Sequence, residues 1–270
     1  MSKYLLIRIL GNDLPNLHGG NQTINNLKFI LDHEFDFYNT DKIFLLNRIV
    51  CSEDRTKIIN LLKRYKKKYI ELPFNISKFK EIKNINLSLN EFKQLSTEEK
   101  VKLLYDYNLY LVNNNGSRNY CIEYGKKNNY EWTFVLDGNS FFTKKSYEII
   151  MNNICNENEY LIIPLKRIQD MKFNNDDLLN IDEKSIDIIP ISEPQIAFKK
   201  SSKYTFNDKI PYGISPKAEF LNALNVKGIW NNWKVNHFID IKDRVFENSN
   251  FQIVSYVFRL HSFNANNKKK

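Results

Sequence analysis

The chain has 270 residues, of which 42% are hydrophobic and 14% aromatic, enough to build a sizeable core and to exclude a disordered chain. Its net charge of +9 favours anionic partners such as nucleotides, phosphorylated substrates, nucleic acid or acidic membranes. Three cysteines without a Cys-x-x-Cys pair exclude a disulfide framework and a zinc knuckle. No signal peptide or membrane-spanning segment is evident, so we expect a cytoplasmic protein.

Strands and helices are predicted to alternate in the first part of the chain. Residues 4–10 form a short apolar run that is typical of a buried strand. Apolar residues at helical spacing follow over 22–32, and a second strand is predicted at 43–47. A helix capped by Ser52 and a third strand at 69–73 continue the pattern. Such a β-α-β-α-β order predicts a parallel sheet.

The middle of the chain begins with a polar, irregular stretch at 76–95, which we expect to be a surface excursion. The sequence Ser-Thr-Glu-Glu at 96–99 is a capping-box signature and predicts a helix to about residue 110. A further helix is predicted over 117–127. The strongly apolar residues 132–136 then predict a strand that ends at Asp137.

After this strand, an amphipathic helix is predicted over 147–154 and a strand over 160–165. Short strands at about 195–199 and 252–260 bracket a helix whose start is indicated by Ser215 and the proline after it. The whole pattern predicts the α/β class, with a mostly parallel central sheet.

The most informative residues lie between 113 and 139. Asn115 and Gly116 predict a turn into a helix with free N–H groups at its start, and Arg118 lies in its first turn. A cation is unfavourable there unless it reaches outward to a phosphate or carboxylate. Asp137 follows at the carboxyl end of a strand, the edge where open α/β sheets bind ligands. Alternatively, Asn115-Gly116 and Asp137-Gly138 are common turn pairs that have no role in binding.

This stretch resembles the GT-A glycosyltransferases, a family of nucleotide-diphospho-sugar transferases. Gly116, Arg118 and Asn119 resemble the G-x-x-x-A-R-N-like helix start of that family, and the Asp-Gly-Asn at 137–139 stands where the family has Asp-x-Asp. The opening Arg-Ile-Leu-Gly-Asn-Asp-Leu-Pro at 8–15 is similar to the first strand and loop of a bacterial and viral subgroup.

The resemblance implies a single GT-A-like domain over 1–270, a Rossmann-related three-layer sandwich. Residues 1–165 would be its nucleotide-sugar-binding half and 166–270 its acceptor-binding part. It also implies that Asp137 and Asn139 coordinate Mn²⁺ or Mg²⁺, which would neutralise the donor diphosphate. Because Asn139 is neutral, this site would hold a metal more weakly, or only together with the donor.

Further donor contacts are implied by the same resemblance. His261, late in the chain, would complete the metal shell, and Arg118 would add positive charge beside the phosphates. Asn12 and Asp13 would lie near the nucleotide base or ribose. The remaining candidates of the helix start are Asn115, Gly116 and Asn119.

The reaction implied is transfer of a hexosyl group from a nucleotide-sugar, a UDP-sugar, to a hydroxyl of a glycan, protein or small molecule. An inverting enzyme needs a carboxylate to take the proton of that hydroxyl. Glu193 and Glu219 are the candidates, unless they are surface or ion-paired glutamates. Glu193 is preferred, because the strand after it is expected beside the active-site edge.

Three alternatives stay open. A nucleotidyltransferase also uses a nucleotide, a metal and an α/β sheet, but the usual glycine-rich phosphate loop is missing near the first strand. A catalytically inactive GT-A-fold binding module is compatible with the Asp-Gly-Asn departure. A nucleic-acid-binding protein would suit the charge, although no helix-turn-helix, zinc finger or RNP-like aromatic motif supports it.

Overall fold

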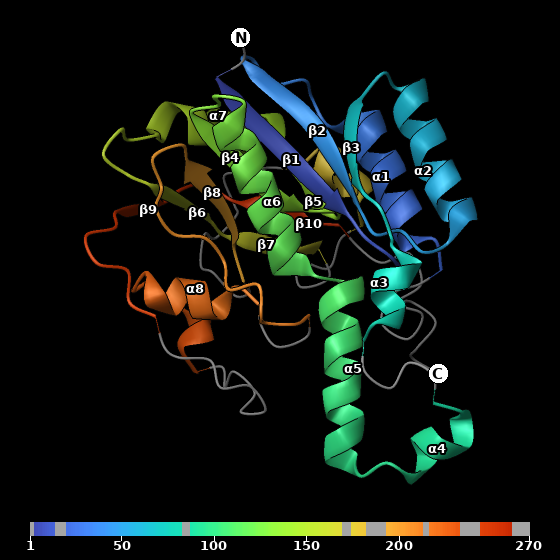
Figure 1. Ribbon diagram of the computed structural model, residues 1–270. Helices are drawn as coiled ribbons and strands as arrows, with labels where there is room; N and C mark the ends of the chain where they lie inside the picture. The colour runs from blue at the N-terminus through green and yellow to red at the C-terminus, as the bar shows by residue number, and fades with distance from the viewer. Residues whose placement is uncertain are drawn as a thin grey trace.

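The computed structural model describes residues 3–13, 20–82, 87–168, 174–181, 193–212, 216–232 and 244–260. Its centre is a seven-stranded sheet in the order β3-β2-β1-β4-β8-β6-β9 (Figure 1). These strands are β1 Tyr4–Leu10, β2 Thr40–Asn47, β3 Lys68–Leu72, β4 Trp132–Asp137, β6 Tyr160–Ile163, β8 Gln195–Lys199 and β9 Phe251–Ile253. Only β8 is antiparallel to its neighbours, so the predicted α/β class with a mostly parallel central sheet is confirmed.

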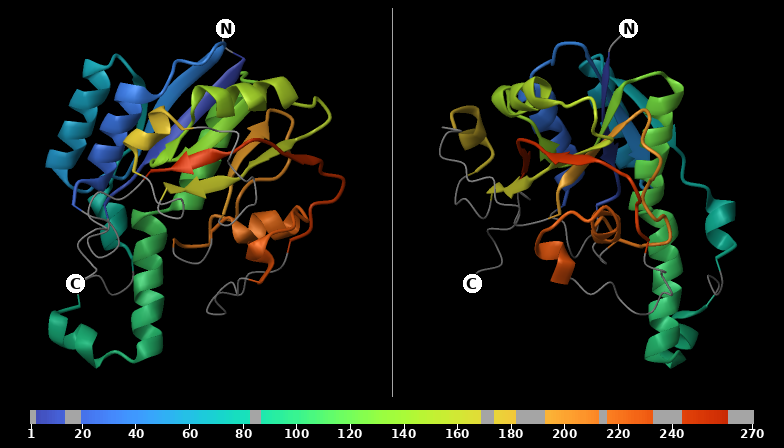
Figure 2. Two further views of the ribbon diagram at one scale, coloured as in Figure 1. Left: turned by 180° about the vertical axis from the view of Figure 1, so that it is seen from behind. Right: turned by 90° about the vertical axis from the view of Figure 1, so that its left-hand side faces the viewer.

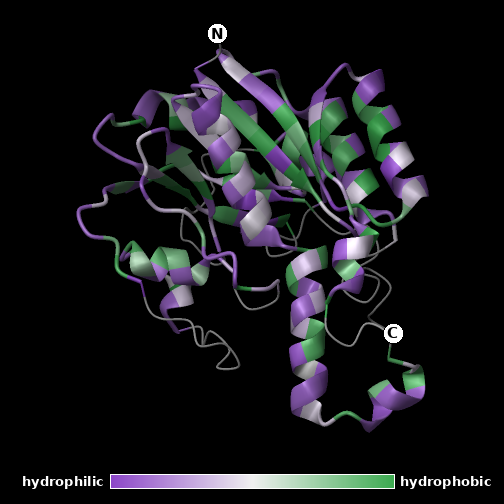
Figure 3. Ribbon diagram, in the orientation of Figure 1, coloured by the Kyte–Doolittle hydropathy of each residue, from purple (hydrophilic) through white to green (hydrophobic). Residues whose placement is uncertain are grey.

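Helices cover both faces of this sheet, as the two views of Figure 2 show. The helices are α1 Gln22–His33, α2 Ser52–Arg64, α3 Ile76–Lys80, α4 Leu89–Gln94, α5 Thr97–Leu111, α6 Asn114–Lys127, α7 Lys144–Asn153 and α8 Ala218–Ala223. Apolar residues of α1 and α2 pack against one face, and those of α6 and α8 against the other. Figure 3 shows the resulting pattern, with apolar strands inside and polar outer helix surfaces.

A small second sheet in the order β5-β10-β7 lies beside the main one. Its strands are β5 Ser140–Phe141, β7 Leu165–Arg167 and β10 Val257–Arg259. Two short 3-10 helices, η2 Asp176–Leu179 and η4 Ile229–Asn232, complete the described elements. Within the described residues, no helix is long and apolar enough to cross a membrane.

Close packing fixes α6 over β4. Gly125 of α6 lies so near Thr133 of β4 that a Cβ at position 125 would come 1.9 Å from the Thr133 Oγ1 atom. At the other end of the helix, Asn113 is the N-cap, in a left-handed conformation with φ 38°, and its side chain accepts a hydrogen bond from the Gly116 N–H. These two contacts set the register in which α6 presents its side chains to the sheet edge.

Several sequence predictions are corrected by the structure. The stretch 76–95 is not irregular throughout, since it contains α3 and α4. Helix α6 begins at Asn114, three residues before the predicted start, so Asn115 and Gly116 are helical rather than a turn. The strand predicted over 160–165 divides at Pro164 into β6 and β7. The predicted capping box at the start of α5 is confirmed by the reciprocal bonds of Ser96 and Glu99.

Candidate functional site

A cavity of about 350 Å³ opens at the carboxyl ends of β1 and β4. The order of the strands reverses between these two, because the chain moves outward through β2 and β3 on one side and returns to β4 on the other. Ligands of open α/β sheets bind at such switch points. The cavity wall includes Asn12, Arg118, Asp137, Glu193 and Lys217.

Asp137, the last residue of β4, is held by three side chains. Its Oδ1 accepts a hydrogen bond from Arg118 Nη2 at 2.8 Å. Its Oδ2 accepts bonds from Lys217 Nζ at 3.0 Å and from Gln195 Nε2 at 3.0 Å. The Asp137 side chain is 35% exposed, whereas those of Arg118 and Lys217 are 4% and 3% exposed. One carboxylate at the cavity wall is therefore neutralised by two buried cations.

The two cations decide the ionisation of this group. Burial by itself raises the pKa of Asp137, but Lys217 and Arg118, together with the bond from Gln195, outweigh burial and hold the pKa well below its ordinary value. Burial lowers the pKa of Lys217, and Asp137 opposes that change. Asp137 therefore stays ionised at neutral pH.

Helix α6 positions Arg118 in its second turn rather than its first. The Arg118 Nη1 atom donates to Asn115 Oδ1 at 2.8 Å, and the guanidinium lies 5.5 Å from the centre of the Phe206 ring. Asn115 also donates to the carbonyl oxygens of Asn207 and Pro216, each at 2.8 Å. Asn115 thus joins the arginine to the segment that carries the lysine.

Gly116 is required by the cap of the same helix. A Cβ at this position would lie 2.1 Å from Asn113 Oδ1, so a larger residue would displace the capping side chain. Asn119 uses both polar atoms of its side chain on the backbone of Phe206, at 2.9 and 3.0 Å. Gly116 and Asn119 therefore fix the helix and a loop, and neither lines the cavity.

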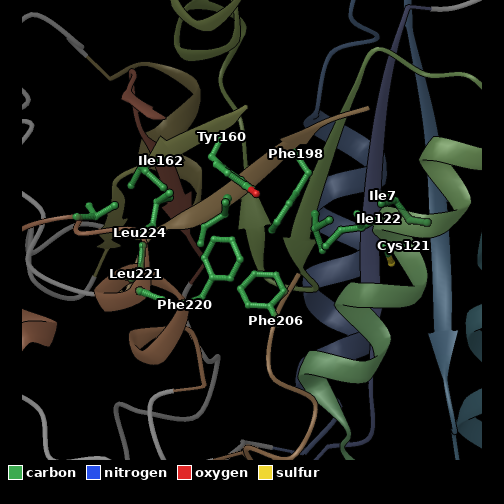
Figure 4. Packing of buried hydrophobic residues seen from close by; sticks show 14 of the residues in the cluster. Ile7, Cys121, Ile122, Tyr160, Ile162, Phe198, Phe206, Phe220, Leu221 and Leu224 are labelled. Carbon is green, nitrogen blue, oxygen red and sulfur yellow. The ribbon is translucent and has the colours of Figure 1, made fainter. Parts of the chain in front are cut away.

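Lys217 lies directly before α8, whose apolar residues enter the core. Figure 4 shows Phe220, Leu221 and Leu224 packed toward Tyr160 and Phe198 of the sheet. The rings of Phe220 and Phe198 are 5.5 Å apart. Since α8 cannot move without disturbing this cluster, the position of the lysine is set by the core.

Asn12 and Asp13 follow β1, and both are occupied by contacts within the chain. Asn12 lines the cavity, and its side chain bonds the Arg48 carbonyl and the Val50 N–H, each at 2.8 Å. Asp13 accepts bonds from the N–H and hydroxyl of Thr23 at 3.0 and 2.6 Å. Asn12 therefore ties the end of β1 to the segment after β2, and Asp13 ties it to the first turn of α1.

The two glutamates proposed as bases are placed differently. Glu193 lines the cavity, and its Oε1 accepts a hydrogen bond from the Lys217 N–H at 3.0 Å. Glu219 is buried and forms a bidentate ion pair with Arg244, with the Nη2–Oε2 distance at 2.6 Å. The structure does not bring Glu219 to the cavity.

The side chains around Asp137 do not suit a divalent metal. Both Asp137 oxygens already accept bonds from cations. Asn139 lines the cavity and offers at most neutral oxygen ligands, and its carbonyl accepts a bond from the Leu260 N–H. His261 lies outside the described residues. In the described part of the chain, no group of three or more His, Cys, Asp or Glu side chains could hold a metal ion.

Sequence reasoning missed most of the positive charge at this site. Arg167 and Arg259 line the cavity from β7 and β10, where they are paired in register. Gln195 was also missed, although it is the first residue of a strand that was predicted beside the active-site edge. The cavity wall described here carries four cations and two carboxylates: Arg118, Arg167, Lys217, Arg259, Asp137 and Glu193.

No family model matches the chain, and no curated protein matches its sequence. Among solved structures, residues 1–349 of S. aureus TarS match with a TM-score of 0.41 and 10% identity, covering 96% of this chain. The same TarS fragment in complex with UDP matches with a TM-score of 0.38 and 8% identity. This chain spans 60% of that fragment. A 4-diphosphocytidyl-2C-methyl-D-erythritol synthase from Anaerococcus prevotii matches with a TM-score of 0.34 and 13% identity, covering 94% of this chain and 87% of that one. Similarities at these TM-scores establish neither a family nor an activity.

Proposed function

We propose that the chain is a glycosyltransferase that transfers a hexosyl group from a nucleoside-diphospho-sugar, a UDP-sugar, to a hydroxyl acceptor. The observation that carries the proposal is the convergence of Arg118 and Lys217 on Asp137 at the carboxyl end of β4. These three side chains line a cavity at the switch point of a mostly parallel sheet. A diphosphate entering this cavity meets cations that are already in place.

The chemistry of glycosyl transfer suits such a cavity. The acceptor oxygen attacks the anomeric carbon, the bond to the diphosphate oxygen breaks, and its electron pair leaves with the nucleoside diphosphate. Fixed cations facing the departing oxygen stabilise the charge that develops there. Arg118 and Lys217 take this role in the proposal, and Glu193, a carboxylate of the same cavity, accepts the proton of the attacking hydroxyl.

The test is calorimetric titration of the protein with UDP, GDP and CDP and with their monophosphates, each with and without added Mn²⁺. We expect one nucleoside diphosphate to bind in preference to the others and to its own monophosphate. Release of that nucleoside diphosphate from its sugar conjugates then identifies the donor. Failure of all three diphosphates to bind under both conditions would refute the proposal.

Further assays on the same protein, with acceptors, nucleoside triphosphates and oligonucleotides, separate the alternatives. Nucleoside diphosphate binding without transfer to any acceptor would indicate an inactive binding module. Consumption of CTP or UTP with release of pyrophosphate would indicate a nucleotidyltransferase. Salt-dependent binding of oligonucleotides, in the absence of mononucleotide binding, would indicate a nucleic-acid-binding protein.

A further inference from the structure

We infer that Lys217 and Arg118, rather than a divalent metal ion, neutralise the diphosphate of the donor, and that Asp137 positions these two cations. The inference rests on the proposed function, because it concerns the same cavity. It departs from the sequence expectation that Asp137 and Asn139 hold Mn²⁺ or Mg²⁺. Four features of the site support it.

The first feature is the occupation of Asp137. Its two oxygens accept bonds from Arg118 at 2.8 Å and from Lys217 at 3.0 Å. A metal bound to this carboxylate would lie beside two cations whose side chains are only 4% and 3% exposed. Repulsion between a dication and two buried cations at contact distance is strong. Metal ligation by Asp137 would therefore require the site to be rebuilt.

The second feature is the rigidity of the cations. Arg118 is fixed by Asn115 as well as by Asp137. Lys217 directly precedes α8, and its backbone N–H donates to Glu193 at 3.0 Å. Cations held in this way lose little conformational freedom when an anion binds. This is the property that lets fixed charges stabilise a developing charge without reorganisation.

The third feature is the amount of charge. A divalent ion brings two positive charges to a diphosphate, and Arg118 and Lys217 bring the same number, partly offset by Asp137. Arg167 and Arg259 add positive charge at the wall of the same cavity. Arginine and lysine are the side chains that bind phosphate oxygens most strongly. The cavity therefore holds enough charge to bind two ionised phosphate groups.

The fourth feature is the shortage of hard anionic ligands. Magnesium and manganese sites are built from carboxylate, carbonyl and water oxygens. Residue 139, which would be the second ligand of the expected site, is a neutral asparagine. Glu193, the other carboxylate of the cavity wall, accepts a hydrogen bond from the backbone of Lys217. The ligands of this cavity wall favour an anion over a cation.

The experiment titrates chelator-treated protein with UDP, GDP and CDP, and repeats each titration after addition of Mn²⁺ or Mg²⁺. We expect the tightest of the three to bind without metal, with an affinity that changes less than about threefold when metal is added. We expect Lys217→Met to lower that affinity about 10- to 100-fold, since a charge-assisted bond to phosphate is lost. The preference for diphosphate over monophosphate should narrow in the same variant.

Lys42→Met is the matched control. Lys42 is also buried and ion-paired, with a side chain 7% exposed and 3.2 Å from Glu34, but it lies on β2 and does not line the cavity. Its variant should bind the nucleotide as the unmodified chain does. Urea denaturation of both variants shows whether they are folded, and the metal comparison on the unmodified chain needs neither variant.

The outcomes distinguish the inference from the function on which it rests. Binding that appears only after Mn²⁺ or Mg²⁺ is added would overturn the inference and leave the glycosyltransferase proposal standing. The same holds if Lys217→Met binds as tightly as Lys42→Met. If none of the three diphosphates binds with or without metal, both proposals fall together.

Discussion

Replacement of Gly125 by alanine tests whether α6 lies on β4 as closely as the structure shows. The added Cβ would lie 1.9 Å from Thr133 Oγ1 and 3.0 Å from its Cβ. The shorter distance is about 1.5 Å less than an ordinary contact. Rotation of the threonine cannot relieve the contact with its Cβ, so the helix has to move. Overpacking of this kind costs about 1–3 kcal/mol, and alanine regains about 1 kcal/mol of helix propensity. A clash as short as this one should cost about 3 kcal/mol, so we expect the free energy of unfolding to fall by about 2 kcal/mol net.

The assay is urea denaturation followed by circular dichroism, in a double-mutant cycle with Thr133→Ala. That second change removes the 1.9 Å contact and leaves only the 3.0 Å contact between the two Cβ atoms, so the two losses should not add, and a coupling of about 1 kcal/mol or more is expected. Gly20→Ala is the control, because a Cβ there meets nothing within 4 Å. Nucleotide affinity should fall in Gly125→Ala, since displacement of α6 moves Arg118 from Asp137. Additive losses, or a more stable Gly125→Ala, would refute this packing of α6 on β4.

Three further predictions concern buried charges. Arg8→Met removes a fully buried guanidinium that lies 2.7 Å from Glu34, and we expect a loss of about 3–5 kcal/mol in urea denaturation; a loss below about 1 kcal/mol would contradict a buried pair. Burial raises the pKa of Glu34, but the charges of Arg8 and Lys42, together with hydrogen bonds from Arg8 and the Phe142 N–H, outweigh burial and leave this pKa lowered. The pKa of Asp137 is lowered as well. Because both folded pKa values lie below the unfolded ones, the stability that these two carboxylates contribute is complete above about pH 5 and is lost progressively as the pH falls below it. The urea midpoint should therefore fall as acid is added, and a midpoint unchanged by acid would be inconsistent with these pairs. Glu219→Gln should weaken the pair with Arg244 and lower the urea midpoint without changing nucleotide affinity; reduced affinity in a folded variant would place Glu219 at the site after all.

The sheet could be predicted from the sequence because its strands are short apolar runs between helices with clear periodicity. Strand β4 reads Trp-Thr-Phe-Val-Leu-Asp, and Asp137 could be placed at the ligand edge because it is the last residue of that run. The start of α6 could not be placed in this way. Asn-Gly at 115–116 is a common turn pair, but the actual cap lies two residues earlier, where Asn113 bonds the Gly116 N–H. The pair Asn-Gly is compatible with a turn and also with the first turn of a helix capped by Asn113, so the sequence alone could not distinguish the two.

Lys217 could not be predicted, because its role depends on contacts far along the chain. It lies 80 residues from Asp137, and no local pattern separates it from other lysines of the chain. Its position follows from the packing of α8 on Tyr160 and Phe198 and from the bond between Asn115 and the Pro216 carbonyl. The role expected of Asn139 as a metal ligand could not be judged from the sequence for the same reason. The three-residue motif at 137–139 does not show which charged side chains the fold brings beside it.

The charged residues of the cavity come from both predicted parts of the chain, residues 1–165 and residues 166–270. Arg118 and Asp137 come from the first part of the chain, whereas Glu193 and Lys217 come from the second. Lys217 touches both carboxylates, through its Nζ to Asp137 and through its N–H to Glu193. An anion that binds Lys217 therefore changes the surroundings of the carboxylate assigned as the base. If the donor diphosphate binds as proposed, it shares the ammonium group with Asp137, and the backbone bond to Glu193 can remain. The same lysine would then hold the donor diphosphate and the proposed base in one place, although the two carboxylates that it contacts are 56 positions apart in the sequence.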